Sequence, residues 1–286
     1  MDSKIIKLSI LIFFLIIKVN AAEFNGKFIQ GHFIIGKTDP NSKVIIDKTK
    51  VKVSKDGFFA FGIDRDRKYD VVIKITTDGN TQKIVKSVQK RKYNIQRIDG
   101  LEEKKVTPPE EVYERIKREN KLIVAAREIN SDLDFFKDKF ILPLDDAIIT
   151  GVYGSQRILN GKPRWPHYGI DFAGDLGTPI KAMADGIVTM VENDLYYTGA
   201  TLIFDHGHGI STLYMHMDEI FVEKDDIVKK GDIIGTVGSS GRSTGPHLDI
   251  RLNWFGTRLD PATVLDINYW VFIFQKKNLN QENQKL

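Results

Sequence analysis

The sequence of 286 residues contains no cysteine. Disulfide bonds, thiolate metal sites, a thiol nucleophile and a lipid-modified cysteine are therefore excluded. Histidine is scarce too, with six residues, so short motifs that contain one are informative. The formal net charge of +4 is spread along the chain and forms no basic patch of the kind that predicts nucleic-acid binding. We therefore expect no nucleic-acid partner.

The first 21 residues have the pattern of a secretory signal. Lys4 and Lys7 precede an apolar run from Leu8 to Ile17, and Val19-Asn20-Ala21 supplies small residues for cleavage. The apolar run has about ten residues, whereas a membrane-spanning helix needs roughly 20. We expect an exported protein, periplasmic or elsewhere in the cell envelope, that contacts a membrane only if the signal stays uncleaved.

Residues 22–100 predict a small β-sandwich domain. Short stretches of aromatic and β-branched residues alternate with turn clusters such as Lys55-Asp56-Gly57 and Thr77-Asp78-Gly79-Asn80. Frequent turns between short strands are typical of a sandwich. No catalytic constellation occurs in this part, and His32, alone among apolar residues, is expected to be structural.

Residues 101–137 predict a linker followed by a helix. The charged stretch from Lys90 to Lys105 lacks periodicity. Thr107, two prolines and Glu110 then form a capping box that predicts a helix start. The helix is either a connector packed on one domain, which we favour, or a partner-binding surface. In the C-terminal tail, residues 267–286, the apolar run from Tyr269 to Phe274 predicts a last strand.

Residues 138–266 predict an all-β domain with mostly antiparallel strands, because glycine and aspartate turns separate short apolar runs. This part holds three motifs: His167 with Asp171, Tyr214-x-His216, and His247-x-Asp249. Imidazole and carboxylate are ligands of catalytic zinc, which keeps one position open for water.

Strand geometry constrains how these residues can meet. His247 and Asp249 are two residues apart, so they share one face of a strand at a separation of roughly 6.6 Å. Extended backbone would place His167 and Asp171 about 13 Å apart, too far to bind one ion. Either Gly169 permits a bend, or both side chains reach inward from a loop. His216 is expected to end a strand.

Two other patterns are assigned no function. Asp205-His206-Gly207-His208-Gly209 resembles a ligand pair, but its glycines between apolar runs indicate a hairpin turn. The glycines from Gly235 to Gly245 lack the Gly-Lys-Ser/Thr end of a phosphate-binding loop and the helix that follows one.

The motifs, in this order, resemble the zinc metallopeptidases of the M23 family, also called the lysostaphin or LytM type. The resemblance extends from about Gly151 to Pro261 and includes Gly151-Val152-Tyr153-Gly154, His167-Tyr168-Gly169-Ile170-Asp171, Gly177-Thr178-Pro179-Ile180, Ala184-Asp185-Gly186, Asp205-His206-Gly207, Leu213-Tyr214-Met215-His216, Val228-Lys229-Lys230-Gly231-Asp232 and Gly241-Arg242-Ser243-Thr244-Gly245-Pro246-His247-Leu248. It implies a compact antiparallel β-sheet domain that cuts peptides of peptidoglycan. It also implies that His167 and Asp171 bind zinc and that His216 and His247 are catalytic.

Asp249 departs from this family, which usually has a second histidine there as the third ligand. A carboxylate oxygen can take about the place of an imidazole Nδ1 and bind zinc at roughly 2.0–2.2 Å. Two anionic ligands would make the metal a weaker Lewis acid and would admit manganese or iron more readily. We expect one zinc ion per chain, held by His167, Asp171 and Asp249, with manganese or iron left open.

The expected function is metal-dependent hydrolysis of peptide bonds in the cross-links or stem peptides of peptidoglycan. An alternative is a catalytically inactive regulator whose partner is a cell-wall amidase that it activates. A third hypothesis is that the N-terminal β-sandwich covers the catalytic cleft as an inhibitory domain.

Overall fold

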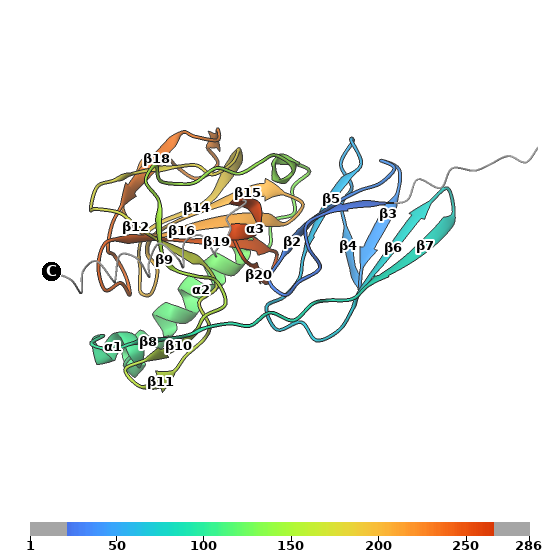
Figure 1. The fold of residues 1–286 in the computed structure, drawn as a ribbon. Helices are drawn as coiled ribbons and strands as arrows, with labels where there is room; N and C mark the ends of the chain where they lie inside the picture. The colour runs from blue at the N-terminus through green and yellow to red at the C-terminus, as the bar shows by residue number, and fades with distance from the viewer. Residues whose placement is uncertain (1–21, 266–286) are drawn as a thin grey trace, which may run out of the picture.

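The computed structural model describes residues 22–265, which form four sheets and a few short helices (Figure 1). The signal sequence and the last strand predicted at Tyr269–Phe274 lie outside the described residues. Within the described part, no helix has both the length and the apolar character needed to cross a membrane.

The N-terminal part consists of two antiparallel sheets, which confirms the predicted β-sandwich. The first sheet has the order β1-β2-β5 and the second the order β4-β3-β6-β7. Inward-facing residues such as Ile34, Phe59, Phe61 and Ile73 are fully buried. The strands are β1 (Glu23–Asn25), β2 (Phe33–Lys37), β3 (Lys43–Ile46), β4 (Thr49–Val51), β5 (Phe58–Gly62), β6 (Val71–Thr77) and β7 (Asn80–Lys86).

The C-terminal part is built on a 10-stranded sheet whose ladders are all antiparallel, as predicted. Its main path is β17-β14-β15-β16-β19-β12-β9, while β13 and β18 pair beside it and β20 pairs with β19. The strands are β9 (Ile148–Gly151), β12 (Ile170–Ala173), β13 (Pro179–Lys181), β14 (Gly186–Leu195), β15 (Gly199–Gly207), β16 (Ile210–Ile220), β17 (Ile227–Val228), β18 (Ile233–Val237), β19 (His247–Trp254) and β20 (Thr257–Leu259).

A third, small sheet joins the two parts and corrects one prediction. The stretch 90–105 was expected to be a linker, but β8 (Ile95–Ile98) pairs in parallel with β10 (Gln156–Leu159). β10 also pairs with β11 (Lys162–Pro163). The partner of β8 lies about 60 residues away in sequence, so local periodicity gives no sign of this strand.

The helical segments are α1 (Glu103–Val106), η1 (Glu110–Val112), α2 (Tyr113–Arg127), η2 (Phe135–Lys137) and α3 (Ala262–Leu265). The capping box predicted at Thr107 is wrong: Thr107 ends α1, and Pro109 precedes η1 without a side-chain cap. The Thr107 hydroxyl instead accepts hydrogen bonds from Lys162 and Arg164. Helix α2 packs against β14 and β15, where Ala126 is buried with Met190 and Ile203. This packing favours the connector interpretation.

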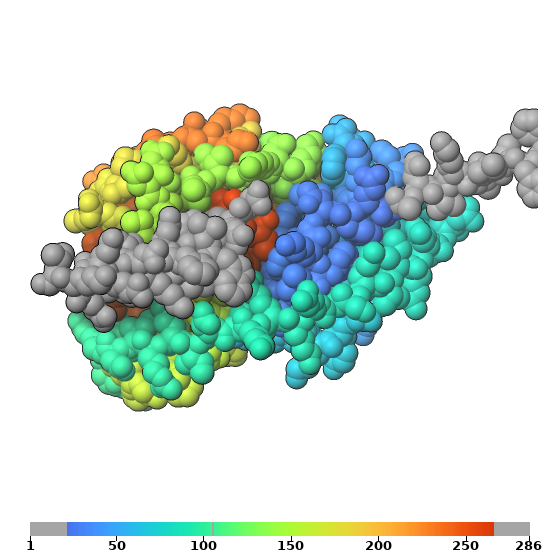
Figure 2. All heavy atoms as spheres, viewed as in Figure 1, coloured from blue at the N-terminus to red at the C-terminus, as the bar shows by residue number. Residues whose placement is uncertain are grey.

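The N-terminal sandwich packs directly against the larger sheet. The Phe61 and Trp254 rings lie 6.5 Å apart between centroids, and Leu259 fills the space beside Gly62. A buried ion pair joins Arg91 Nη1 to Asp260 Oδ2 at 2.6 Å. In the space-filling view the residues at the blue end of the chain lie against those at the red end (Figure 2). The two parts therefore share one continuous core.

Candidate active site

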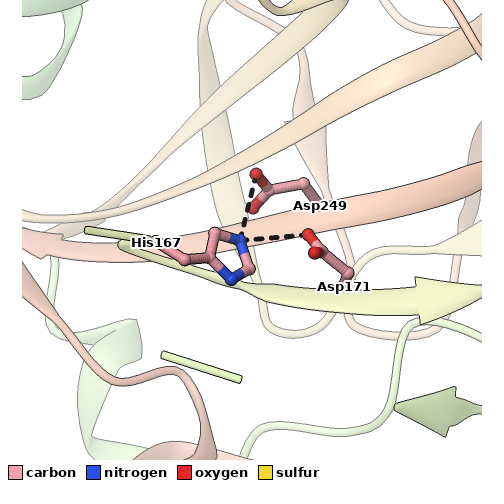
Figure 3. Close-up of side chains that lie close together, drawn as sticks. All are labelled: His167, Asp171 and Asp249. Atoms are coloured by element: carbon pink, nitrogen blue, oxygen red, sulfur yellow. Dashed lines mark ion pairs between the residues drawn. The ribbon is translucent and has the colours of Figure 1, made fainter. Parts of the chain in front are cut away.

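His167, Asp171 and Asp249 lie together in the larger sheet, with their side chains pointing toward one another (Figure 3). Asp171 on β12 and Asp249 on β19 are directly opposite each other in the antiparallel ladder. His167 comes from the loop before β12, and its Nε2 lies 3.0 Å from Asp171 Oδ1 and 3.4 Å from Asp249 Oδ2. The strand register thus places both carboxylates beside one imidazole.

The loop before β12 explains how His167 and Asp171 come close together. His167 precedes the strand and reaches inward, so extended geometry does not separate it from Asp171. Gly169 has a different role from the bend considered above, because a Cβ there would lie 2.2 Å from Asp249 Oδ1. Gly151 likewise makes room for Asp171, since its Cβ would lie 2.1 Å from Oδ2. Both glycines are required by the close approach of a carboxylate.

The three side chains are buried: His167, Asp171 and Asp249 are 0%, 10% and 2% exposed. Burial opposes a charge on His167, but the Asp171 and Asp249 carboxylates outweigh it and raise the imidazole pKa. Burial also opposes ionisation of Asp249, yet Arg251 and His167 hold its carboxyl pKa below the usual value. Burial likewise opposes ionisation of Asp171, but His167 holds its carboxyl pKa below the usual value, so both carboxylates are ionised, as metal ligands must be.

The cluster fits a small divalent cation. In a tetrahedral zinc site with bonds of about 2.0–2.2 Å, ligand atoms lie roughly 3.4 Å apart, which matches the measured 3.0 and 3.4 Å. Both ring nitrogens of His167, Asp171 Oδ1 and Asp249 Oδ1 make no hydrogen bond of good geometry although they are buried. Buried polar atoms without partners are rare, and a bound cation would give such groups a partner.

His216 and His247 lie next to each other, with ring centroids 4.8 Å apart. His216 Nδ1 lies 2.8 Å from the Ser240 carbonyl, and His247 Nδ1 lies 2.8 Å from the Gly245 carbonyl. A carbonyl only accepts hydrogen bonds, so Nδ1 carries the proton in both rings. In the neutral form of either ring, Nε2 is therefore the atom that can accept a proton. Burial lowers the pKa of His216 to about 4 and keeps it a free base at neutral pH.

The prediction that His216 ends a strand is wrong. β16 continues to Ile220, and His216 lies within it at a shift in register between Tyr214 and Met217. Its φ of 62° is positive, a conformation that costs a residue with a side chain of order 1–3 kcal/mol and is frequent at functional sites. The bulge, which sequence does not reveal, directs the ring toward His247.

A cleft of about 270 Å³ lies beside the buried cluster. Asp171, His216 and His247 line it together with Arg157 and Arg242. The segment before the larger sheet contributes Gln96, Ile98 and Leu101 to its wall, whereas the described strands β1–β7 contribute no lining residue. Among residues 22–265, the strands of the sandwich therefore do not line the cleft, and its N-terminal wall comes from β8 and Leu101.

The remaining histidines of the sequence motifs lie elsewhere. Gly207 pairs with Ile210 in the hairpin between β15 and β16, as the glycines predicted. His206 is buried between the Asp185 carbonyl, 2.7 Å from Nδ1, and Thr212 Oγ1, 2.8 Å from Nε2. His206 therefore has a structural role.

Two arginines at the site were missed by the sequence analysis. Arg157 Nη2 lies 3.1 Å from Asp171 Oδ2, and Arg251 Nη2 lies 3.2 Å from Asp249 Oδ2. Arg251 follows Asp249 by two residues on one strand, so its position carried a usable signal. Arg157 carried no such signal, because it lies on β10, which pairs with the distant strand β8.

A comparison with known families identifies the domain that contains these residues. Residues 165–261, which include all five candidate residues, match the model of peptidase family M23. These residues therefore form a domain of this metallopeptidase family. A crystal structure of a candidate M23 peptidase from Pseudomonas aeruginosa is similar in fold. The similarity covers 84% of the present chain and 95% of the Pseudomonas chain, with 25% sequence identity and a TM-score of 0.62. The fold assignment thus extends beyond the matched domain.

Curated relatives have similar M23 domains. The DD-carboxypeptidase/endopeptidase Mpg of Neisseria meningitidis is 42% identical over 98 residues, or 34% of this chain and 22% of that protein. The peptidoglycan DD-endopeptidase ShyA of Vibrio cholerae is 42% identical over 87 residues, or 30% of this chain and 20% of that protein. The matches span only about a fifth of the relatives' length.

Proposed function

We propose that this protein is a metal-dependent endopeptidase that hydrolyses peptide bonds in the cross-links or stem peptides of peptidoglycan. The observation that carries the proposal is the convergence of His167, Asp171 and Asp249 on one point, with Asp171 lining the same cleft as the neighbouring His216 and His247. The relative named as a peptidoglycan DD-endopeptidase supports the substrate class. Such a substrate lies in the cell envelope, in agreement with the export predicted from residues 1–21.

The residues divide into two groups with different tasks. His167, Asp171 and Asp249 would hold zinc, for which one imidazole and two carboxylate oxygens are suitable ligands, while manganese or iron is also compatible with the oxygen donors. When bound, the ion supplies polarisation of the scissile carbonyl and acidification of water. The buried ligands keep this centre within the sheet, and the cleft gives the peptide access to it.

His216 and His247 would move protons. The Ser240 and Gly245 carbonyls fix Nδ1–H in the two rings, so each Nε2 can accept a proton and return it. One histidine takes the proton of the attacking water, and the other, once protonated, stabilises the oxyanion or donates to the leaving amine. The separation of 4.8 Å between the rings allows both to face one peptide bond.

The test combines product analysis with metal content. The protein is incubated with peptidoglycan and defined metals, and mass spectrometry identifies the products. We expect His216→Ala and His247→Ala to abolish cleavage without releasing metal, and His167→Ala to lose both. His32→Ala, a histidine of the sandwich, is the matched control and should retain both. Unchanged hydrolysis in the His216→Ala/His247→Ala double variant would contradict the assignment.

The amidase-activator alternative has no specific support from these relatives. It predicts that the protein releases no new amino termini from peptidoglycan with zinc or manganese and yet stimulates a purified cell-wall amidase. The same incubation, with and without the amidase, distinguishes the two functions.

A further inference from the structure

We infer that Arg157 and Arg251 are positioning residues, each holding one of the two ligand carboxylates in place for the metal. The inference rests on the metal site proposed above. It explains how a site with Asp249 in place of the family's histidine can bind a cation and keep it electrophilic.

The two carboxylate oxygens of Asp171 have different neighbours. Oδ1 lies 3.0 Å from His167 Nε2, on the side where the ligands converge, whereas Oδ2 lies 3.1 Å from Arg157 Nη2. The Arg157 side chain is 19% exposed and comes from β10, which is paired with β8. Arg157 also precedes the residues that match the family model. The joining sheet thus contributes a side chain to the metal centre.

The contact between Arg251 and Asp249 lies within one strand. Both belong to β19, and Arg251 Nη2 lies 3.2 Å from Asp249 Oδ2. A carboxylate oxygen has two lone pairs, so Oδ2 can accept this hydrogen bond and still face His167 Nε2. A guanidinium only donates, and an imidazole that binds a cation through one nitrogen offers it no acceptor. Arg251 therefore suits aspartate at position 249 and not histidine.

The charges of the ligand side chains also favour a role for the two arginines. A neutral imidazole and two carboxylates would cancel the charge of a divalent cation completely. Two buried carboxylates on adjacent strands also repel each other in the absence of a cation. The two guanidinium groups offset this negative charge, so the loaded site would keep a positive excess with which to polarise a carbonyl. Each ligand carboxylate has its own arginine.

The experiment is a double-mutant cycle on metal affinity, which is independent of peptidase activity. Zinc affinity is measured by competition with a chromophoric chelator at one fixed pH. Loss of a group that orients a metal ligand typically lowers affinity about 10–100-fold, and we expect this from Arg157→Gln and from Arg251→Gln. In the Asp249→His background, Arg251→Gln should cause no loss, whereas Arg157→Gln should still lower the affinity.

Arg258→Gln is the matched control. Arg258 is a half-buried arginine near Arg251 that stacks on the Tyr168 ring at 4.5 Å. Its removal deletes a positive charge near the site without freeing a ligand carboxylate, and we expect zinc affinity within a factor of two to three of wild type. Arg251→Lys, which keeps the charge but lacks the planar fork, should recover part of the lost affinity. Circular dichroism establishes that each variant is folded.

Several outcomes would overturn the inference. Unchanged or increased affinity in Arg157→Gln and Arg251→Gln would show that the arginines merely sit beside the ligands or repel the cation. An equal loss from Arg251→Gln with either residue at position 249 would overturn the link to Asp249. If the Asp249→His variants do not fold, the zinc affinities of Arg251→Gln, Arg251→Lys and Arg258→Gln still test whether Arg251 positions Asp249. A wild-type protein that binds zinc but cleaves nothing would contradict the proposed function alone.

Discussion

Acid should destabilise this protein partly through His206, the buried histidine of the β15–β16 hairpin. Burial lowers the pKa of His206 to about 4 from the usual 6.5. Below pH 6.5 the unfolded chain therefore binds a proton that the folded chain excludes. The stabilising contribution is complete above pH 6.5 and is lost as the pH falls through 6.5 toward 4. Between pH 7 and pH 5 the loss from this one group is roughly 2 kcal/mol.

The assay is urea unfolding at pH 7 and pH 5, with a chelator present so that metal release does not contribute. His206→Gln is the perturbation, because glutamine offers a donor and an acceptor to the Asp185 carbonyl and Thr212 but does not titrate. His32 and His208 also have pKa values lowered to about 4 by burial, and they titrate in both proteins. The variant should therefore lose about 2 kcal/mol less than wild type over this interval. An equal loss in both proteins would refute the reasoning.

Two further predictions concern the metal site. In Gly169→Ala the new Cβ would lie 2.2 Å from Asp249 Oδ1 and 2.5 Å from the Ile250 carbonyl, so we expect zinc affinity to fall by roughly 10-fold or more in chelator competition. Gly256→Ala, where the nearest atom is 3.9 Å away, is the control, and equal affinities in the two variants would contradict the prediction. Free zinc at 100 times its dissociation constant should stabilise the folded wild-type protein by about 2.7 kcal/mol in urea unfolding. His167→Ala should show no such gain, and an equal gain would argue against His167 as a ligand.

Sequence alone predicted the β-sandwich, the antiparallel sheet and the grouping of His167 with Asp171 and Asp249, because each follows from local pattern or from motif order. It failed where structure depends on distant pairing. Strand β8 exists because β10 lies beside it, and the helix start moved because Thr107 bonds Lys162 and Arg164 instead of capping. The positive φ of His216 is likewise imposed by the register shift in β16.

The two arginines also differ in whether local pattern or distant strand pairing places them. Arg251 is fixed by strand periodicity next to Asp249, so any sequence with this strand places it there. Arg157, which contacts Asp171, lies on β10 between β11 and β8, and the β8 residues Gln96 and Ile98 also line the cleft. Disruption of β8 would thus act twice, opening one wall of the cleft and releasing the arginine that holds a metal ligand. The segment that the sequence presented as a linker therefore connects the N-terminal sandwich to the chemistry of the M23 domain.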